Sequence, residues 1–409
     1  MKHVCIGILL ATSLACSAST ASDATPADAV QANTDDVLGA TNQAAPQNTP
    51  DTPSPPLVKD LTVTLKPPSA GYQITTEPYV VPPGTEVDIC TVIRMEPDAD
   101  ERFSWIHRLE SLVSQGTHHM NIFIGQFSFL DGYLGDGAAE SALGVPLGQY
   151  PCDELAVMES AFPVFPSQRQ NQQIQMPAGV AIPMPVPLVL IASHHYINAT
   201  QEPVRINAAL NMESIAGNAV DNVAGLIFDA GPTEVPAGVR KVEKATCIFE
   251  RDVEVVLVST HNHEWTECAT LNHYDGETQT ISPDPFYVNK NWDQPPILNF
   301  DVGEYSVQAG DGVHFACHYH NYTNRLLVND GTATGEMCVF AAVTYPMAES
   351  VEAVETVLNQ GELSELIEFM DQALGPCDKL ELEHASPWPS TIQTENGVTC
   401  AGLVQTESN

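Results

Sequence analysis

Histidine is the residue of this chain whose type and spacing best suit metal chemistry. Neutral imidazole is the commonest metal ligand in proteins and suits copper, zinc and iron. A single histidine on a strand is usually an ordinary polar residue, but most of the 13 histidines here fall into four short groups. Such grouping in one chain favours metal binding. The groups are Thr117-His118-His119-Met120, Ser193-His194-His195-Tyr196, Thr260-His261-Asn262-His263 and Cys317-His318-Tyr319-His320.

Strand geometry sorts these groups only in part. His261 and His263 are two residues apart, so on a strand both side chains project from one face and form a two-nitrogen chelate. His318 and His320 have the same spacing, so spacing does not choose between the two pairs. His118 and His119 are adjacent and would point to opposite faces of a regular strand. They can share one ion only at a strand end or at a bulge.

The segments that carry these histidines have the composition of short β-strands, from about residue 58 to 346. They are rich in Val, Ile, Phe and Tyr and are separated by Pro and Gly, and 31 prolines argue against long helices. Many strands without alternating helices favour antiparallel sandwiches or jelly rolls. The clearest runs are "LTVTL" from Leu61, "MNIFIG" from Met120, "VPLVLIASHHYI" from Val186, "VEVVLVSTHNH" from Val253 and "MCVFAAVTY" from Met337.

This strand-rich stretch is too long for one ordinary sandwich. We therefore predict an all-β fold of two tandem antiparallel β-sandwich, jelly-roll-like domains, at residues 58–225 and 226–346. The remaining stretch, 347–409, has helical spacing of Val, Leu, Ile and Phe. We expect one or two helices in this C-terminal extension, packed on the second sandwich.

The first residues read as an export signal. Lys2 is followed by an apolar run from Val4 to Ala15, which is too short to span a membrane, so 1–16 is interpreted as a signal peptide. Cleavage after an alanine is one alternative. A lipoprotein signal, with Cys16 lipidated as a membrane tether, is the other. The polar stretch 17–57 buries too little apolar surface to fold and is interpreted as a disordered linker. Export places the protein in the bacterial periplasm, on the outer membrane or outside the cell.

Charge and cysteine content restrict the class of protein. Lys plus Arg number 15 against 52 Asp plus Glu, a formal net charge of −37, which disfavours nucleic acid as a partner. Two of the 10 cysteines, Cys5 and Cys16, lie in the leader. An even number remains, which favours disulfide bonds in an exported chain. The sequence has no C-x-x-C motif, which disfavours a zinc site. The remaining cysteines are Cys90, Cys152, Cys247, Cys268, Cys317, Cys338, Cys377 and Cys400.

Four segments, in order and with similar spacing, resemble the copper type II, ascorbate-dependent monooxygenases, which include peptidylglycine α-hydroxylating and dopamine β-monooxygenases. The resemblance covers about residues 90–346. "GTHHMNIFIG" resembles the His-His-Met stretch of the family, and "LVLIASHHYINAT" resembles its L-Q-x-H-Y-x-N strand. "STHNH" resembles its His-x-His segment. "AGDGVHFACHY" with "TGEMCVF" resembles G-D-x-x-x-x-x-C-x-Y followed by E-E-M-C.

The resemblance implies two copper sites with different roles. One ion, which relays electrons, would be held by His118, His119 and His195. The second, where oxygen is activated, would be held by His261, His263 and Met337, so these three are the expected catalytic residues. The thioether of Met337 is soft and favours Cu(I). His194 is interpreted as a neighbour of the first site, and His318 with His320 as structural or supporting residues.

The resemblance also implies disulfide pairings. In the family a disulfide at the position of Cys317 and Cys338 holds the methionine strand, and we expect that pair here. Cys90 with Cys152 would brace the His118 region. Cys247 would pair with Cys377 or Cys400, and Cys268 with the other.

Three positions differ from the peptidylglycine-hydroxylating members of the family. Those enzymes bind the substrate carboxylate and backbone with an Arg, an Asn and a Tyr, where this chain has Ser259, Val339 and Ala341. We expect these residues to line a pocket without a fixed cation, so a peptide ending in glycine is disfavoured. Arg325 is the alternative cation for such a substrate.

The sequence therefore predicts an exported copper-dependent monooxygenase. It would hydroxylate a C–H bond of a small organic substrate, with O₂ and an external one-electron reductant such as ascorbate. We expect the two coppers to face each other from different sandwiches, across a solvent-filled cleft. The alternative function is a non-catalytic, copper-binding or copper-handling lipoprotein with the same fold.

Overall fold

The computed structural model of the chain describes residues 58–96, 102–156, 161–231, 233–329, 335–373, 377 and 379–383. The expected signal peptide at 1–16, the linker at 17–57 and the lipidation site Cys16 lie outside these ranges. All described residues belong to one compact unit.

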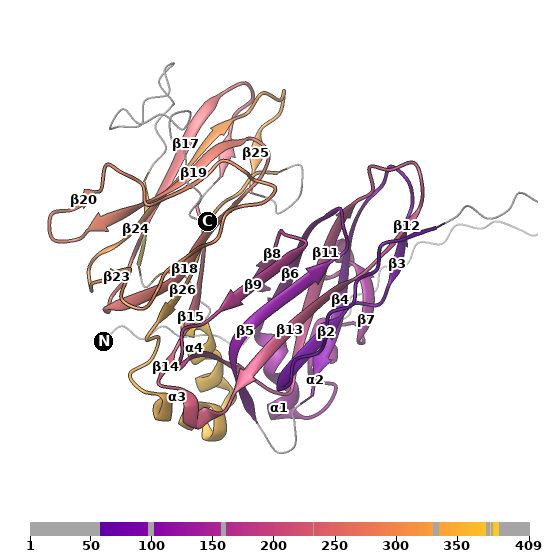
Figure 1. Cartoon of the computed structure of the whole chain (residues 1–409), viewed down its shortest axis with the longest axis horizontal. Coiled ribbons are helices and arrows are strands. Elements are labelled where there is room, and N and C mark those ends of the chain that lie inside the picture. The colour runs from indigo at the N-terminus through magenta and orange to yellow at the C-terminus, as the bar shows by residue number, and fades with distance from the viewer. Residues whose placement is uncertain are drawn as a thin grey trace, which may run out of the picture. The chain divides into compact units, whose positions relative to one another are not determined.

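The first sandwich consists of two mainly antiparallel sheets (Figure 1). One sheet has the order β14-β10-β5-β13-β2, with β9 also paired to β5; the other has the order β7-β4-β11-β6-β8. The strands of the first sheet are β2 (Gly71–Thr75), β5 (Phe103–Val113), β9 (Asn171–Gln175), β10 (Val180–Pro185), β13 (Ala208–Ile215) and β14 (Asn222–Val223). Those of the second are β4 (Glu86–Met95), β6 (Thr117–Ile124), β7 (Gly148–Pro151), β8 (Phe162–Ser167) and β11 (Leu188–Ile197).

Alternating apolar side chains join these two sheets. Ile106 and Leu210 from one sheet and Ile122 and Leu190 from the other belong to a single buried cluster. Short elements complete this half of the chain. They are β1 (Lys59–Asp60), β3 (Tyr79–Val81), β12 (Val204–Ile206), η1 (Gln126–Phe129), α1 (Leu130–Leu134), α2 (Ala138–Leu143), η2 (Cys152–Glu154) and η4 (Gly217–Ala219).

The second sandwich also has two antiparallel sheets, of order β15-β26-β18-β22 with β23 on β18, and β20-β19-β24-β17-β27 with β21 on β19. Phe315 and Phe340 stack across its core with ring centroids 5.8 Å apart. The strands of the first of these sheets are β15 (Gly225–Ala230), β18 (Val253–Asn262), β22 (Leu298–Asn299), β23 (Ser306–Val307) and β26 (Cys338–Tyr345). Those of the second are β17 (Arg240–Ile248), β19 (Thr266–Asp275), β20 (Thr280–Ile281), β21 (Tyr287–Asn289), β24 (Gly312–His320) and β27 (Lys379–Glu383), and β16 (Glu234–Val235) pairs with β25 (Leu327–Val328).

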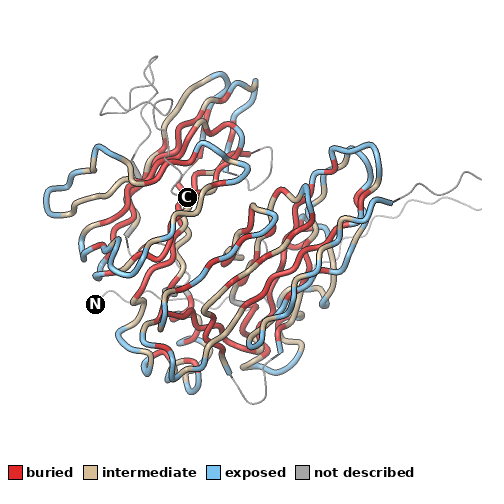
Figure 2. The backbone as a smooth tube through the Cα atoms, viewed as in Figure 1, coloured by how far each residue is buried: buried red, intermediate tan, exposed pale blue. Residues whose placement is uncertain are grey.

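The sheet that contains β18 and β26 is buried on both faces. Cys338, Phe340 and Ala342 of β26 belong to the core of the second sandwich. Val343, from the opposite face, belongs with Leu257 of β18 to the cluster of the first sandwich. Figure 2 shows the resulting buried stretches along the central strands, with exposed residues concentrated in the loops. The two sandwiches therefore share an apolar contact along β18 and β26.

The C-terminal helices are α3 (Val351–Gln360) and α4 (Leu363–Ala373). Ser350 caps α3 by accepting a hydrogen bond from the backbone N–H of Ala353. The expectation that the helices pack on the second sandwich is wrong in part. Their buried residues Leu358 and Phe369 belong to the cluster that joins the first-sandwich core to residues of β18 and β26, and α4 also contacts β15 of the second sandwich.

The C-terminal extension is also not purely helical. After α4, β27 pairs with β17 and adds a strand to the second sandwich. The alternating segment "KLELE" has the period of a strand, which the helical pattern before it concealed. The all-β class, the antiparallel sandwiches and the short helical segment near the C-terminus are confirmed.

Candidate metal centre

Three histidines of the first sandwich converge on one point. The ligand nitrogens of His118, His119 and His195 all lie within 4.8 Å of one another. The ring centroids are 4.9 Å apart for His118 and His119, 5.0 Å for His118 and His195, and 4.9 Å for His119 and His195. The predicted first ligand set is thus brought together, in a geometry from which three nitrogens can reach one ion.

The adjacent pair His118 and His119 converges because of its place in the sheet. β6 begins at Thr117, so both residues lie at the start of the strand. His119 pairs directly with His195 of β11, and the register then shifts between His195 and Tyr196. Such an irregularity redirects side chains that a regular strand would send to opposite faces. The strand-end condition expected from the sequence is therefore met.

A carboxylate orients His195. The Oε1 atom of Glu86 lies 2.6 Å from Nε2 of His195. A carboxylate only accepts, so Nε2 carries the proton and Nδ1 has the lone pair that a metal needs. The Nδ1 atom of His119 is buried and has no hydrogen-bond partner among the described residues. A buried imidazole nitrogen without a partner is costly, and a bound ion would satisfy it, so these residues fit a metal.

Burial favours the neutral form of His118 and His119. It lowers the pKa of His118 from 6.5 to about 4, with help from His195 and His263. Burial and the neighbouring histidines likewise lower the pKa of His119 well below 6.5. Only a neutral imidazole can donate its lone pair to a metal, so the cluster is prepared for a cation at neutral pH.

His261 and His263, at the end of β18 and just beyond it, form a second pair, with ring centroids 5.2 Å apart. The Nδ1 atom of His263 lies 3.0 Å from the carbonyl oxygen of Gly335. The Nδ1 atom of His261 lies 3.1 Å from Oε1 of Gln168. In both rings Nδ1 therefore donates, and Nε2 carries the lone pair. Burial and the neighbouring His263 and His118 lower the pKa of His261 to about 3.

Glu336 links the backbone of Met337 to that of His263 in this pair. The Oε1 atom of the buried Glu336 accepts hydrogen bonds from the backbone N–H groups of His263, at 2.6 Å, and Met337, at 2.8 Å. In the sheet Asn262 pairs with Cys338, so His263 directly follows, and Met337 directly precedes, the last paired residues of β18 and β26. Both residues therefore lie at the same end of these two paired strands. Burial raises the pKa of Glu336 to about 7.

The two histidine sets are adjacent. The rings of His119 and His261 have centroids 6.4 Å apart. The expectation of a solvent-filled cleft between the sets is wrong for this structure, because rings this close leave no room for one. Trp292 packs its indole ring on His118, with centroids 5.4 Å apart, and the buried Gln168 reaches His261.

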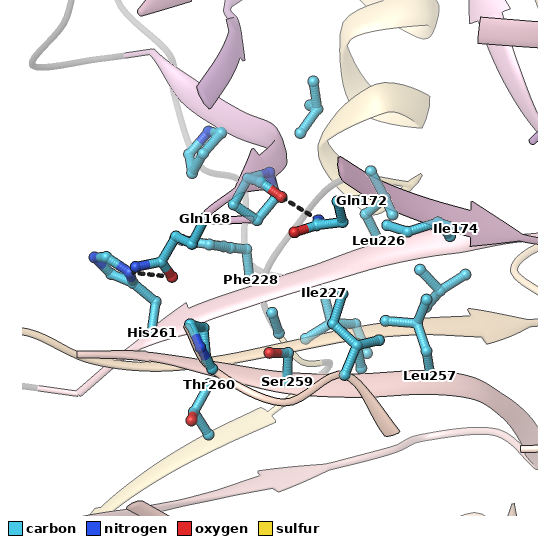
Figure 3. A pocket seen from close by; sticks show the side chains of 18 of the residues that line it. Gln168, Gln172, Ile174, Leu226, Ile227, Phe228, Leu257, Ser259, Thr260 and His261 are labelled. Atoms are coloured by element: carbon cyan, nitrogen blue, oxygen red, sulfur yellow. Dashed lines mark hydrogen bonds between the residues drawn. The ribbon is translucent and has the colours of Figure 1, made fainter. Parts of the chain in front are cut away.

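An apolar cavity of about 70 Å³ lies beside His261 (Figure 3). Ser259 and Ala341 line it as expected, whereas Val339 is not among its lining residues. No Lys, Arg, Asp or Glu is among the described residues that line it. The guanidinium of Arg325 instead lies 5.4 Å from the ring centroid of Trp265. The other lining residues include Leu109, Val164, Ile174, Leu226, Ile227, Leu257 and Ile297.

The remaining grouped histidines lie outside both sets. The Nε2 atom of His194 is 2.8 Å from the hydroxyl of Thr117, and burial lowers the pKa of His194 to about 3. His318 is buried on β24, where burial and the nearby Lys244 lower its pKa to about 4. His320 lies 3.5 Å from a carboxylate oxygen of Glu267. The interpretation of these three as neighbouring or structural residues agrees with their positions.

The disulfides confirm several expected pairs. Cys317 bonds Cys338, with Cα atoms 5.8 Å apart, and ties β24 to the start of β26 directly after Met337. Cys90 bonds Cys152. Cys247 bonds Cys377 rather than Cys400, and Cys268 is also disulfide-bonded, while Cys400 lies outside the described residues. Asp229 lies beside the Cys247–Cys377 pair, but those sulfurs are already bonded to each other and offer no thiolate to a metal.

The disulfides indicate a non-reducing, exported environment. In the part of the chain that the structure describes, no helix has the length and apolar character needed to cross a membrane.

Four residues of this centre were not found from the sequence: Glu86, Gln168, Trp292 and Glu336. Glu336 had one signal, because it directly precedes Met337. The other three come from segments with no motif, and only the folded chain brings them to the histidines. Comparison with models of known protein families gives no match, and no curated protein matches the sequence.

Proposed function

We propose that this protein is an exported, copper-dependent monooxygenase. It would hydroxylate a C–H bond of a small organic substrate, using O₂ and an external one-electron reductant such as ascorbate. The observation that carries the proposal is the placement of a three-imidazole cluster beside a second histidine pair that is joined to a methionine. The resemblance of the four histidine and methionine segments to the copper type II monooxygenases supports the same function.

The side chains divide into two donor sets. His118, His119 and His195 would hold one copper ion, and His261, His263 and Met337 the other. Three imidazoles suit both oxidation states of copper, whereas a thioether favours Cu(I). Zinc is the rival metal, but structural zinc prefers thiolates, and the cysteines shown in disulfides are not available to it. Bound copper would supply the two one-electron transfers and the activation of O₂ that hydroxylation requires.

The chain's own residues prepare both sets for that chemistry. Glu86 fixes the tautomer of His195, and Gly335 fixes that of His263. Glu336 holds the backbone of His263 and Met337 in one register. The cavity beside His261 is lined mainly by apolar side chains and by no charged residue, which favours an uncharged, mainly aliphatic substrate group. A glycine-extended peptide would leave its carboxylate without a cation.

Tethering to a membrane through lipidated Cys16 is part of the proposal. Replacing Cys16 with Ser would move the protein from the membrane fraction to the soluble fraction. A wild-type protein that is already soluble and begins beyond Cys16 would contradict the tether and leave export intact.

The experiment that tests the function is anaerobic loading with Cu(I), followed by oxygen uptake with ascorbate against a panel of small substrates. Substrate-dependent uptake that yields a hydroxylated product supports the monooxygenase. Tight copper binding without substrate-dependent uptake would instead favour the copper-handling alternative. Absence of copper binding would exclude both.

A further inference from the structure

Gln168 of the first sandwich forms two hydrogen bonds to the second sandwich. It lies between β8 and β9 of the first sandwich and is 8% exposed. Its Oε1 lies 3.1 Å from Nδ1 of His261, on β18 of the second sandwich. Its Nε2 lies 3.2 Å from the carbonyl oxygen of Trp292. Figure 3 shows the Gln168 side chain extended toward His261, with the hydrogen bond dashed.

The chemistry of these two bonds fixes their direction. The carbonyl oxygen of Trp292 can only accept, so the amide NH₂ of Gln168 must face it. The amide oxygen of Gln168 then faces His261 and must accept from Nδ1–H. His261 is thereby held in the tautomer whose Nε2 is unprotonated. That nitrogen is the one able to bind a metal.

The same segment of the second sandwich covers the three-histidine cluster. The indole ring of Trp292 packs on His118, with centroids 5.4 Å apart, and Arg169 donates a hydrogen bond of 3.2 Å to the carbonyl oxygen of Pro295. Residues 168 and 169 thus bind the segment 292–295 at the place where it rests on the first histidine set. The Gln168 amide therefore connects the orientation of His261 to the position of Trp292, whose ring packs on His118.

We propose that Gln168 is a positioning residue for the second metal site. It holds His261 in the metal-binding tautomer, and its amide NH₂ binds the backbone of Trp292, whose ring packs on His118. This role rests on the proposed function for its purpose, because it concerns the metal site of the monooxygenase. No histidine motif surrounds Gln168 in the sequence. Its role follows from the two hydrogen bonds and their direction.

A matched control is present in the same cavity. Gln172 also lines the cavity, is buried, and donates a hydrogen bond of 2.6 Å to the carbonyl oxygen of Pro166. It has no hydrogen bond to a histidine among the described residues. Gln172→Leu therefore removes a buried amide of the same size without changing His261.

The test uses Cu(II) alone, added to protein that carries His195→Ala, so that the first donor set is incomplete. Gln168→Leu should weaken Cu(II) binding at the second site by about 10- to 100-fold. Pulsed EPR should also show a changed signal from the remote imidazole nitrogen, because Nδ1 of His261 loses its acceptor. Gln172→Leu should leave affinity within about twofold and the nitrogen signal unchanged.

A second variant separates orientation from folding. In Gln168→Glu the carboxylate still accepts from Nδ1 of His261 but cannot donate to the carbonyl of Trp292. Copper affinity should return to within about threefold of the parent, while the fluorescence of Trp292 changes. Unchanged affinity and nitrogen signal in Gln168→Leu, or no recovery in Gln168→Glu, would overturn the role. Copper binding that depends on Gln168 in a protein without oxygen uptake would contradict the proposed function alone.

Discussion

His119 and His261 have ring centroids 6.4 Å apart, although they belong to different sandwiches. The contact forms because β18 presents His261 from the sheet face that packs on the first sandwich. His261 is held in the tautomer whose Nε2 can bind a metal. The buried Nδ1 of His119 has no hydrogen-bond partner among the described residues and can also bind one. Changes on either side of this contact are therefore expected to have separable effects on the two donor sets.

The Cys317–Cys338 disulfide should support the second donor set and leave the first intact. It closes a segment with a sequence separation of 21 residues. Replacing both cysteines with Ala should lower the free energy of unfolding by about 3 kcal/mol and weaken Cu(I) binding at the Met337 site. Chelator competition measures the copper, and chemical denaturation measures the stability. Cys90→Ala with Cys152→Ala is the control, and equal loss at the second site in that variant would contradict the prediction.

Glu336 should be required for the fold around Met337. Its carboxylate is fully buried and accepts hydrogen bonds from the backbone N–H groups of His263, Trp265 and Met337. Glu336→Ala leaves these donors without an acceptor and should cost about 3 kcal/mol or more of stability. Glu336→Gln keeps one acceptor oxygen and should cost less. Thermal unfolding that ranks the two variants equally would show that the carboxylate does not hold this register.

The stability of the metal-free protein should fall in mild acid, in part through His318. Burial lowers the pKa of His318 from 6.5 to about 4. Between those values the unfolded chain binds a proton that the folded chain refuses, so the free energy of unfolding decreases as pH falls from about 6.5 to about 4. The contribution of this residue is at most roughly 3 kcal/mol. His318→Gln should flatten the pH dependence by about one proton, measured by urea unfolding at several pH values. An identical slope in the variant would refute this.

Substrate preference should follow the apolar lining of the cavity. Ala341 lines it together with aliphatic residues. Ala341→Phe should fill the space and reduce hydroxylation of an aliphatic substrate about tenfold or more, with copper content unchanged. Glycine-extended peptides should be poor substrates of the wild-type protein. Efficient turnover of such a peptide would show that a cation outside the lining residues binds the carboxylate.

The sequence was sufficient for the parts of the molecule that depend on local pattern. Alternating apolar residues predicted the strands, and the His-x-His spacing predicted a shared face for His261 and His263. The Cys317–Cys338 pairing followed from the family resemblance. Contacts between distant segments could not be read in this way. Gln168 and Trp292 carry no local signal, and the short distance between the histidine sets depends on how the two sandwiches pack.

The most direct test of the proposed function is copper content under anaerobic saturation with Cu(I), combined with hydroxylation. The wild-type protein should bind two copper ions and show substrate-dependent oxygen uptake. His195→Ala should bind about one, because the Met337 site remains. Met337→Ile should also bind about one, at the three-histidine site, and lose hydroxylation. A wild-type protein that binds a single copper ion, or a Met337→Ile variant with full activity, would contradict the mechanism.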